Sequence, residues 1–365
     1  MRTRRFFPPG STIGIFGGGQ LGRMMILAAV KLGYKCRIFC KEANSPAQFV
    51  ATSVTIADYD NLAALNTFSK KVDIVTLEFE NIPLKTIQFI EKKVPTQPSS
   101  QCLKISQDRV LEKTFISKVA DVTPFHQVDN QATLQFAAKK LGYPVMLKTR
   151  QFGYDGKGQV LVEKKSKLNY AWKKLSKHKL ILESCIQLKQ EISVIVARKH
   201  DGTIVIFPPT ENQHSKQILH SSRIPANISK KTERKVKKVA ERICTKLKLV
   251  GILAVEFFIS HTGQILVNEI APRPHNSGHW TLDGCSTSQF EQHIRAICGL
   301  PFGPTNATHD VEMQNLLGKD IKNWKKLLSE PNARLHVYDK DKIKRDRKMG
   351  HVNRLYPLGS TKAKK

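Results

Sequence analysis

Residues 251–270 read GILAVEFFISHTGQILVNEI, two apolar segments on either side of the turn dipeptide Thr262-Gly263. This pattern predicts an antiparallel β-hairpin with a two-residue turn. In that register Glu256 lies opposite Glu269, so both carboxylates share one face of the sheet about 5 Å apart, where like charges repel. Because the neighbouring side chains are apolar, we expect a divalent cation between the carboxylates, and oxygen-only ligation favours Mg²⁺ bound to nucleotide phosphates. The alternative is a carboxylate pair on a solvent-facing edge.

A loop rich in polar side chains follows the hairpin directly. Residues 271–280 read APRPHNSGHW. The guanidinium of Arg273 suits bidentate recognition of bicarbonate or carboxyphosphate, and the prolines on both sides of it fix the path of the chain. His275 and Asn276 add polar groups beside the expected metal, although either histidine of this loop could be structural.

A second stretch predicts a phosphate-binding loop. Lys148 ends an expected strand, and residues 152–158 read FGYDGKG. Its three glycines allow the loop to close over a polyphosphate with its N–H groups inward, and Lys148 and Lys157 supply positive charge. The alternative is an ordinary glycine-rich hairpin turn, which does not explain the lysines on both flanks.

The first hundred residues alternate between short apolar strands and amphipathic helices, which predicts a parallel sheet with helices on both faces. The expected strands cover 12–16, 35–40 and 72–77, and the expected helices cover 20–31, 62–70 and 84–92. Gly17–Gly22 (GGGQLG) satisfies G-x-G-x-x-G between a strand and a helix, and Glu42 follows the second strand. Taken alone, this pattern is also typical of NAD-binding Rossmann domains, but many α/β domains turn tightly on glycine at this point.

From about residue 123 the pattern changes to antiparallel hairpins. After the breaker-rich segment 94–100, helices are expected over 107–118, 132–141 and 230–248. Strands are expected over 145–149, 159–162, 180–183, 191–197, 205–207, 251–259 and 264–270. The expected fold class is therefore α/β in the first part of the chain and α+β in the rest.

Composition indicates a folded protein of two or three domains. The chain has 365 residues, of which 40% are hydrophobic and 7% aromatic, and no apolar run approaches the ~18 residues of a membrane span. Residues 1–10 look like a ragged extension, because no apolar segment or cleavage site follows the basic start. The seven cysteines are scattered without a C-x-x-C spacing, which argues against disulfides and a zinc site. We expect a soluble cytoplasmic protein with no membrane partner.

The charge balance is extreme, because 60 basic and 30 acidic residues give a net charge of +30. Nucleic-acid binding would explain such a surplus. However, the lysines of the expected helix 230–248 surround an apolar stripe, as on a solvated helix face. We therefore expect no nucleic-acid partner. The densest basic cluster begins at Arg334.

Three motifs together resemble the ATP-grasp superfamily and, within it, the family of N5-carboxyaminoimidazole ribonucleotide synthases. They are GGGQLGRM at 17–24, FGYDGKGQ at 152–159 and NEIAPRPHNSGHW at 268–280, and the segments YDK at 338–340 and RKMGH at 347–351 support them. The resemblance runs from about residue 12 to residue 353. Two positions depart from the family pattern: Phe152 replaces the usual glycine, and Glu211 stands where histidine is frequent.

The resemblance implies an ATP-grasp fold with a Rossmann-like pre-ATP-grasp domain (1–105), a lid subdomain (106–188), a catalytic subdomain (189–310) and a small C-terminal domain with a basic tail (311–365). It implies ATP- and bicarbonate-dependent carboxylation of 5-aminoimidazole ribonucleotide through carboxyphosphate, in purine biosynthesis. It further implies Mg²⁺, with Mn²⁺ as the alternative metal, and a homodimer. The nearest rival function is a formate-dependent ATP-grasp ligase. More distant rivals are an NAD-dependent oxidoreductase and a basic RNA-binding protein.

The family's functional residues can be placed on the matching positions of this sequence. The ATP-binding positions are Arg109, Lys148, Phe152, Gly153, Tyr154, Asp155, Gly156, Lys157, Gly158, Glu183, Ser184, Cys185, Ile186, Glu191, His214, Asn268 and Glu269. The metal ligands are Glu256 and Glu269. The positions facing the ribonucleotide are Gly19, Gln20, Leu21, Glu78, Lys340 and Arg347. The catalytic positions are Asp155, Arg273, His275 and Asn276, with Asp155 or His275 expected to accept the proton of the amine.

Overall fold

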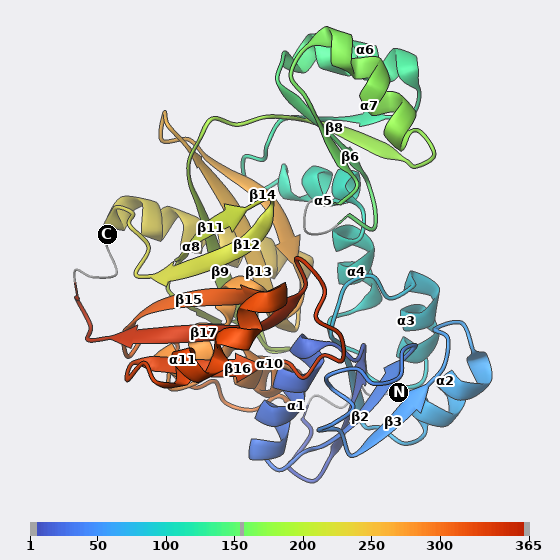
Figure 1. Cartoon of the computed structure of the whole chain (residues 1–365). Coiled ribbons are helices and arrows are strands. Elements are labelled where there is room, and N and C mark those ends of the chain that lie inside the picture. Colours follow the sequence, from blue (N-terminus) through green and yellow to red (C-terminus); the bar gives the residue numbers. More distant parts are fainter. Residues whose placement is uncertain (1–5, 154–156, 361–365) are drawn as a thin grey trace.

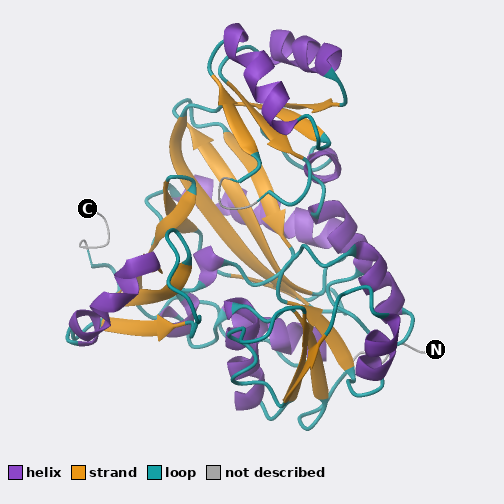
Figure 2. Cartoon of the chain, turned by 45° about the vertical axis from the view of Figure 1, so that its right-hand side comes forward, coloured by secondary structure: helices purple, strands orange, loops and turns teal. Residues whose placement is uncertain are grey.

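The computed structural model describes residues 6–153 and 157–360 of the chain. The predicted loop residues Tyr154, Asp155 and Gly156 lie outside the described residues. The chain forms three sheets: an N-terminal parallel sheet, a small antiparallel sheet that projects at the top of Figure 1, and a large antiparallel sheet through the middle of the molecule (Figures 1 and 2).

The N-terminal sheet is parallel and covered by helices on both faces, as predicted. Its strands in spatial order are β3 (Ser53–Ile56), β2 (Lys35–Cys40), β1 (Thr12–Phe16) and β4 (Ile74–Leu77). Ile13 and Ile15 face the core formed with α1 (Gln20–Lys31) and the distant helix α10 (Gln289–Cys298). Phe16 and Phe39 point to the other face, toward α2 (Leu62–Ser69) and α3 (Leu84–Glu91). Edge strand β3 was not predicted, because none of its side chains is buried.

The small sheet carries two helices on its outer face (Figure 1). Its strands in spatial order are β5 (Phe125–Val128), β8 (Leu180–Ser184), β6 (Val145–Thr149) and β7 (Gln159–Val162), and the helices are α6 (Gln131–Leu141) and α7 (Leu168–Leu175). A capping box of Asn130 and Thr133 starts α6. Leu134, Ala138, Leu147 and other apolar residues form a separate core between the helices and the sheet.

A helix was predicted over residues 107–118 and is confirmed, but a second helix that precedes it was not predicted. The chain forms two helices, α4 (Ser100–Ser106) and α5 (Arg109–Ile116), which link the N-terminal sheet to the small sheet. The break falls at Gln107, whose carboxamide donates to the carbonyls of Glu80 and Ile82. Asp108 then caps α5 by accepting from the N–H groups of its first turn.

The large sheet joins the hairpin of residues 251–270 to the C-terminal strands. Its path is β14 (Ile265–Ala271), β13 (Gly251–Ser260), β9 (Leu188–Arg198), β11 (Thr210–Ser215), β12 (Ile218–Ile224), β15 (Asp310–Leu317), β17 (Lys348–Tyr356) and β16 (Ala333–Val337), and β10 (Ile204–Ile206) pairs with β9. Helix α8 (Lys230–Leu247) packs its apolar stripe on one face, while short α9 (Thr281–Gly284) follows the hairpin and α11 (Trp324–Leu328) packs near β16.

The hairpin pairs Glu256 with Glu269, as predicted, but by a different route. The turn is one residue longer than predicted, because Ile259 pairs with Ile265. A β-bulge at Asn268 then adds one residue to β14 and restores the predicted register, in which Glu256 faces Glu269. Without the bulge, Glu269 would pair with the residue that precedes Glu256 on β13. Its side chain would then point into the apolar core beneath α8.

Candidate active site

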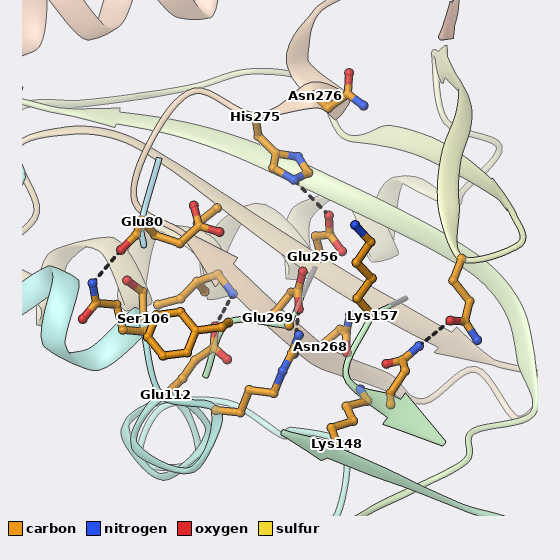
Figure 3. A pocket seen from close by; sticks show the side chains of 18 of the residues that line it. Glu80, Ser106, Glu112, Lys148, Lys157, Glu256, Asn268, Glu269, His275 and Asn276 are labelled. Atoms are coloured by element: carbon orange, nitrogen blue, oxygen red, sulfur yellow. Dashed lines mark hydrogen bonds and ion pairs between the residues drawn. The ribbon is translucent and has the colours of Figure 1, made fainter. Parts of the chain in front are cut away.

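One cavity of about 860 Å³ lies where the N-terminal sheet, the small sheet and the large sheet meet (Figure 3). Its walls include most of the predicted site residues. These are Gln20, Leu21, Glu78, Arg109, Lys148, Phe152, Gly153, Lys157, Glu183, Ser184, Cys185, Ile186, Glu191, His214, Glu256, Asn268, Glu269, Arg273, His275 and Asn276. Positions far apart in the sequence therefore converge on one space.

The bulge in β14 directs two consecutive side chains into this cavity. Asn268 and Glu269 both line it, and Glu256 lies beside them (Figure 3). Burial, together with the neighbouring Glu269 carboxylate, raises the pKa of Glu256 to about 7. Burial also opposes ionisation of Glu269, but the Arg109 guanidinium, 2.9 Å away, holds the pKa of Glu269 below its usual range. The pair thus holds one ionised carboxylate and one that resists ionisation.

These oxygens fit a divalent cation that also binds phosphate. The side-chain oxygen of Asn268 is buried and accepts no hydrogen bond from the described residues, and an uncompensated buried acceptor is costly. Two carboxylates and one amide oxygen form a hard donor set that Mg²⁺ prefers. Within residues 6–153 and 157–360, no three His, Cys, Asp or Glu side chains converge as a metal site. A phosphate or water can supply the remaining ligands.

A buried ion network lies at the base of the cavity. Lys148 Nζ contacts Glu183 Oε2 at 2.8 Å, and Lys113 Nζ lies 3.6 Å from the same oxygen. Burial opposes ionisation of Glu183, but the two ammonium groups more than offset it and lower its pKa to about 2. Lys113 also donates to the carbonyl of Asn268 at 2.9 Å, the residue at the bulge. It therefore joins helix α5 to both antiparallel sheets.

Lys113 was not predicted as a site residue. It lies four positions after Arg109, so both cations occupy one face of α5. This spacing was present in the sequence and could have indicated it. Lys113 does not line the cavity itself, whereas the unpredicted residues of the cavity wall include Glu80, Glu112, Gln217 and Lys348. Burial, followed by the nearby Glu269, raises the pKa of Glu112 to about 8.

Glu191 and His214 form a pair on the large sheet. His214 Nδ1 lies 2.6 Å from Glu191 Oε2. Burial lowers the pKa of His214, but the hydrogen bond and charge of Glu191 outweigh it, so the net pKa is raised. Glu211, the position that departs from the family pattern, is bound to the N–H of Asn227 instead and does not line the cavity.

Arg273 is held by an acid that was not predicted. Its Nε and Nη2 donate to the two carboxylate oxygens of Glu80, and Nη1 donates to the carbonyl of Pro274 at 3.1 Å. These bonds use three of the five guanidinium donors, which leaves two for an anion. Asn276 adds further capacity, because both polar atoms of its buried amide lack partners among the described residues.

His275 lies beside Glu256 of the carboxylate pair. Its Nε2 lies 3.4 Å from Glu256 Oε1 (Figure 3), and its Nδ1 lies 2.9 Å from the hydroxyl of Ser277. Burial and, secondly, the charge of Arg273 lower the pKa of His275 to about 3. The imidazole is therefore neutral at physiological pH and can accept a hydrogen bond or a proton from a ligand.

The glycine turn binds a carboxylate of the protein itself. Glu78 accepts from the backbone N–H groups of Gly19 and Leu21 at the start of α1. A Cβ atom on Gly19 would lie 2.3 Å from Glu78 Oε1, so glycine is required for this approach. Burial raises the pKa of Glu78. Because Glu78 occupies the amides that would hold a pyrophosphate, the turn disfavours the NAD-binding alternative.

Among the predicted positions that the structure describes, four do not line the cavity: Gly19, Gly158, Lys340 and Arg347. Gly19 acts through Glu78, as described above. Lys340 lies over the ring of Tyr338, close enough to Glu78 for its charge to offset a small part of the rise in the pKa of Glu78 that burial causes. Arg347 donates to the carbonyl of Lys342.

All seven cysteines are free thiols, and six of them are buried, which agrees with the expectation of no disulfides. No helix in the described parts of the chain is long and apolar enough to cross a membrane.

Family models match the three parts of the chain in order. Residues 11–107 match the ribonucleotide synthetase preATP-grasp domain, residues 113–290 the ATP-grasp domain, and residues 312–358 the phosphoribosylaminoimidazole carboxylase C-terminal domain.

Two relatives that align with this chain over nearly their full length have the same name. The chain is 43% identical to the N5-carboxyaminoimidazole ribonucleotide synthase of Brucella melitensis, over 96% of this chain and 97% of that protein, and 42% identical to that of Bacillus subtilis, over 96% and 93%. It is also 45% identical to a bifunctional purine synthesis protein of Dictyostelium discoideum, of which it spans only 37%.

Solved structures agree in fold over nearly the whole chain. An N5-carboxyaminoimidazole ribonucleotide synthetase in complex with ADP superimposes with a TM-score of 0.94 at 44% identity, covering 97% of this chain and 94% of that one. The Aspergillus clavatus enzyme in complex with ADP and 5-aminoimidazole ribonucleotide gives a TM-score of 0.89 at 29% identity, covering 96% and 94%.

Proposed function

The chain belongs to the family of N5-carboxyaminoimidazole ribonucleotide synthases, ATP-grasp ligases of purine biosynthesis, and on this premise we propose which residues bind each substrate and which take part in the reaction. ATP, bicarbonate and 5-aminoimidazole ribonucleotide share the one cavity. The observation that carries the proposal is the convergence of Glu256, Glu269 and Asn268 with Lys148 and Lys157 on that space.

ATP binds between the small and the large sheet. The adenine lies at the apolar part of the wall, near Met146, Ile186 and Phe258, where the backbone of residues 184–186 can read its edge. Glu191 accepts from the ribose hydroxyls. Arg109 and Lys148 meet the phosphates, as positive charges at a triphosphate must, and Lys157, which lines the same cavity, adds a further positive charge.

Glu256, Glu269 and the amide oxygen of Asn268 would hold Mg²⁺. When bound, this ion supplies positive charge that shields the phosphate oxygens during transfer. Arg109 and Lys148 add charge from the protein. Burial and the nearby ionised Glu269 make Glu256 resist ionisation. A cation between the two carboxylates would relieve their repulsion, which supports this proposal.

The ribonucleotide binds at the junction with the N-terminal sheet. Gln20 and Leu21 line the cavity there, and Glu78 fixes the turn that presents them. The 5′-phosphate requires cations, and Lys340 and Arg347 of the basic segment are the candidates. Lys348, which lines the cavity, is a third.

The reaction begins with attack of a bicarbonate oxygen on the γ-phosphorus of ATP. The new O–P bond forms as the bond to the β-phosphate oxygen breaks, which yields ADP and carboxyphosphate. Arg273, oriented by Glu80, holds the bicarbonate with its remaining donors. Carboxyphosphate releases CO₂ and phosphate in place, and the exocyclic amine attacks the carbon of CO₂. The amine proton passes to neutral His275 or to Asp155.

One assay tests the proposed function. ADP release is measured with purified protein, ATP and magnesium, with and without bicarbonate and with and without 5-aminoimidazole ribonucleotide, and the carboxylated product is followed by incorporation of labelled bicarbonate. We expect ADP release to require bicarbonate and label to require the ribonucleotide. ADP release that requires formate in place of bicarbonate would establish the rival ligase instead.

Cytoplasmic location and a homodimeric state are part of the same proposal. Leu27 and Val30, one helical turn apart on α1, are 52% and 54% exposed and offer an apolar face for a second copy. Light scattering on purified protein measures its mass. A monomer at all accessible concentrations would contradict the dimer.

A further inference from the structure

Helix α10 packs between the N-terminal sheet and the strands of the large sheet that include the catalytic hairpin. Its residues Phe290, Ile294 and Ile297 belong to the core shared with α1 and the N-terminal sheet. Buried His293 links the N-terminal sheet to the large sheet. Its Nε2 lies 2.7 Å from the hydroxyl of Thr76 on β4, and its Nδ1 accepts from the N–H of Ile252 on β13. The helix is thus fixed to the ribonucleotide side and to the catalytic sheet.

The first residue of this helix, Gln289, binds the loop that carries the catalytic groups. Its Oε1 accepts from the N–H of His275 at 2.9 Å, and its Nε2 donates to the carbonyl of the same residue at 2.7 Å. Gln289 is fully buried. The hydroxyl of Thr281 accepts from the N–H of Gln289 and donates to the carbonyl of Gly278, which closes the loop onto the helix.

The loop is shaped to admit this amide. A Cβ atom on Gly278 would lie 2.5 Å from Oε1 of Gln289, so only glycine permits the approach. A primary amide also fits both bonds, since its nitrogen donates and its oxygen accepts from the same planar end group. A carboxylate could accept from the N–H of His275 but would face its carbonyl oxygen without a donor.

We propose that Gln289 is a positioning residue, which holds the backbone of His275 so that the imidazole and the neighbouring Arg273 meet bicarbonate and the ribonucleotide amine in one geometry. This inference rests on the proposed roles of Arg273 and His275. Gln289 contacts no ligand itself. It acts through the main chain of the loop, and α10 transmits the position of the N-terminal sheet to that loop.

The chain provides a matched control on the same helix. Gln292 is also fully buried, and its amide binds one loop residue in the same way: Nε2 donates to the carbonyl of Gly303 at 2.6 Å, and Oε1 accepts from its N–H at 3.2 Å. Gly303 does not line the cavity. Gln292→Met therefore removes two bonds equivalent to those between Gln289 and His275 without disturbing the catalytic loop, although Gln289→Met also removes a 3.3 Å contact with His279 Nδ1.

The experiment measures the amount of carboxylated product formed per ADP released. We expect both methionine variants to lower the melting temperature similarly. Only Gln289→Met should lose coupling, because misplaced groups release carboxyphosphate before the amine captures its carbon. Product formation by Gln289→Met should fall about 10- to 100-fold, as small displacements of reacting groups do, with little change in the KM for ATP.

Equal coupling and equal kcat in the two methionine variants would overturn the positioning role and leave the proposed function intact. If Gln289→Met does not fold, Gln289→Glu decides, since it keeps the volume and the bond to the N–H of His275. Coupling at the wild-type level in Gln289→Glu would count against the proposal. Failure of the wild-type protein to release ADP with bicarbonate would instead refute the proposed function itself.

Discussion

Replacing Glu256 by glutamine should stabilise the protein in the absence of metal. Burial and the charge of Glu269 raise the pKa of Glu256 to about 7 from an ordinary value of 4.5. The unfolded chain therefore loses this proton near pH 4.5, while the folded protein keeps it until about pH 7. In that window the folded state binds more protons, so the free energy of unfolding falls as pH rises.

The difference between 4.5 and about 7 sets the size of the effect. It corresponds to about 3 kcal/mol that the ionised carboxylate costs the folded protein above pH 7. Glutamine has the same shape and does not ionise. We therefore expect Glu256→Gln to exceed the wild type in unfolding free energy by about 1 to 3 kcal/mol near pH 8, and by little near pH 5, where Glu256 is protonated in the folded wild type.

Urea denaturation with a chelator present, at both pH values, measures these differences. Glu269→Gln serves as the contrasting variant, because Arg109 holds the pKa of Glu269 low and its removal should destabilise the protein at the higher pH. Added Mg²⁺ should stabilise the wild type and not Glu256→Gln. A Glu256→Gln protein that is less stable than the wild type near pH 8, or shows the same difference at both pH values, would refute the reasoning.

Three further substitutions test separate parts of the site. Arg273→Ala should lower bicarbonate-dependent ADP release at least about 100-fold while fluorescence titration shows nucleotide binding retained; near-normal turnover would remove its proposed role. Lys148→Met should weaken ATP binding about tenfold or more and lower the melting temperature, because Glu183 loses its nearest partner; unchanged ATP affinity would contradict this. Lys113→Met leaves the carbonyl of Asn268 without its buried donor. The magnesium concentration for half-maximal activity should therefore rise, with a smaller change in the KM for ATP. An unchanged magnesium dependence would contradict a role of Lys113 in positioning Asn268.

The sequence predicted the strands of the hairpin and the acids on them more reliably than it predicted the path between them. The pairing of Glu256 with Glu269 is confirmed, although the turn that led to the prediction is wrong. Period-two alternation cannot reveal a bulge, because one extra residue shifts the pattern only after Asn268. The longer turn and the bulge shift the register in opposite directions, so the two errors cancel at Glu256 and Glu269.

Partners from distant segments could not be predicted from the sequence. Glu80 binds Arg273, and Gln289 binds His275, through contacts that depend on how the N-terminal sheet and α10 meet the hairpin. The glycine turn is a similar case. Its spacing indicates an anion at the start of α1, but nothing local shows that the anion is the side chain of Glu78. Motifs thus located the cavity, and tertiary packing decided which groups face one another.

The C-terminal strands extend the same sheet that carries the catalytic hairpin. Strands β15, β17 and β16 continue from β12 by main-chain hydrogen bonds. A chain truncated before Asp310 would expose β12 as an open edge, the kind of edge that recruits other chains into aggregates. Loss of the last strands should therefore make the whole protein insoluble, in addition to removing the proposed phosphate-binding residues, and heat should melt the catalytic and terminal parts in a single transition.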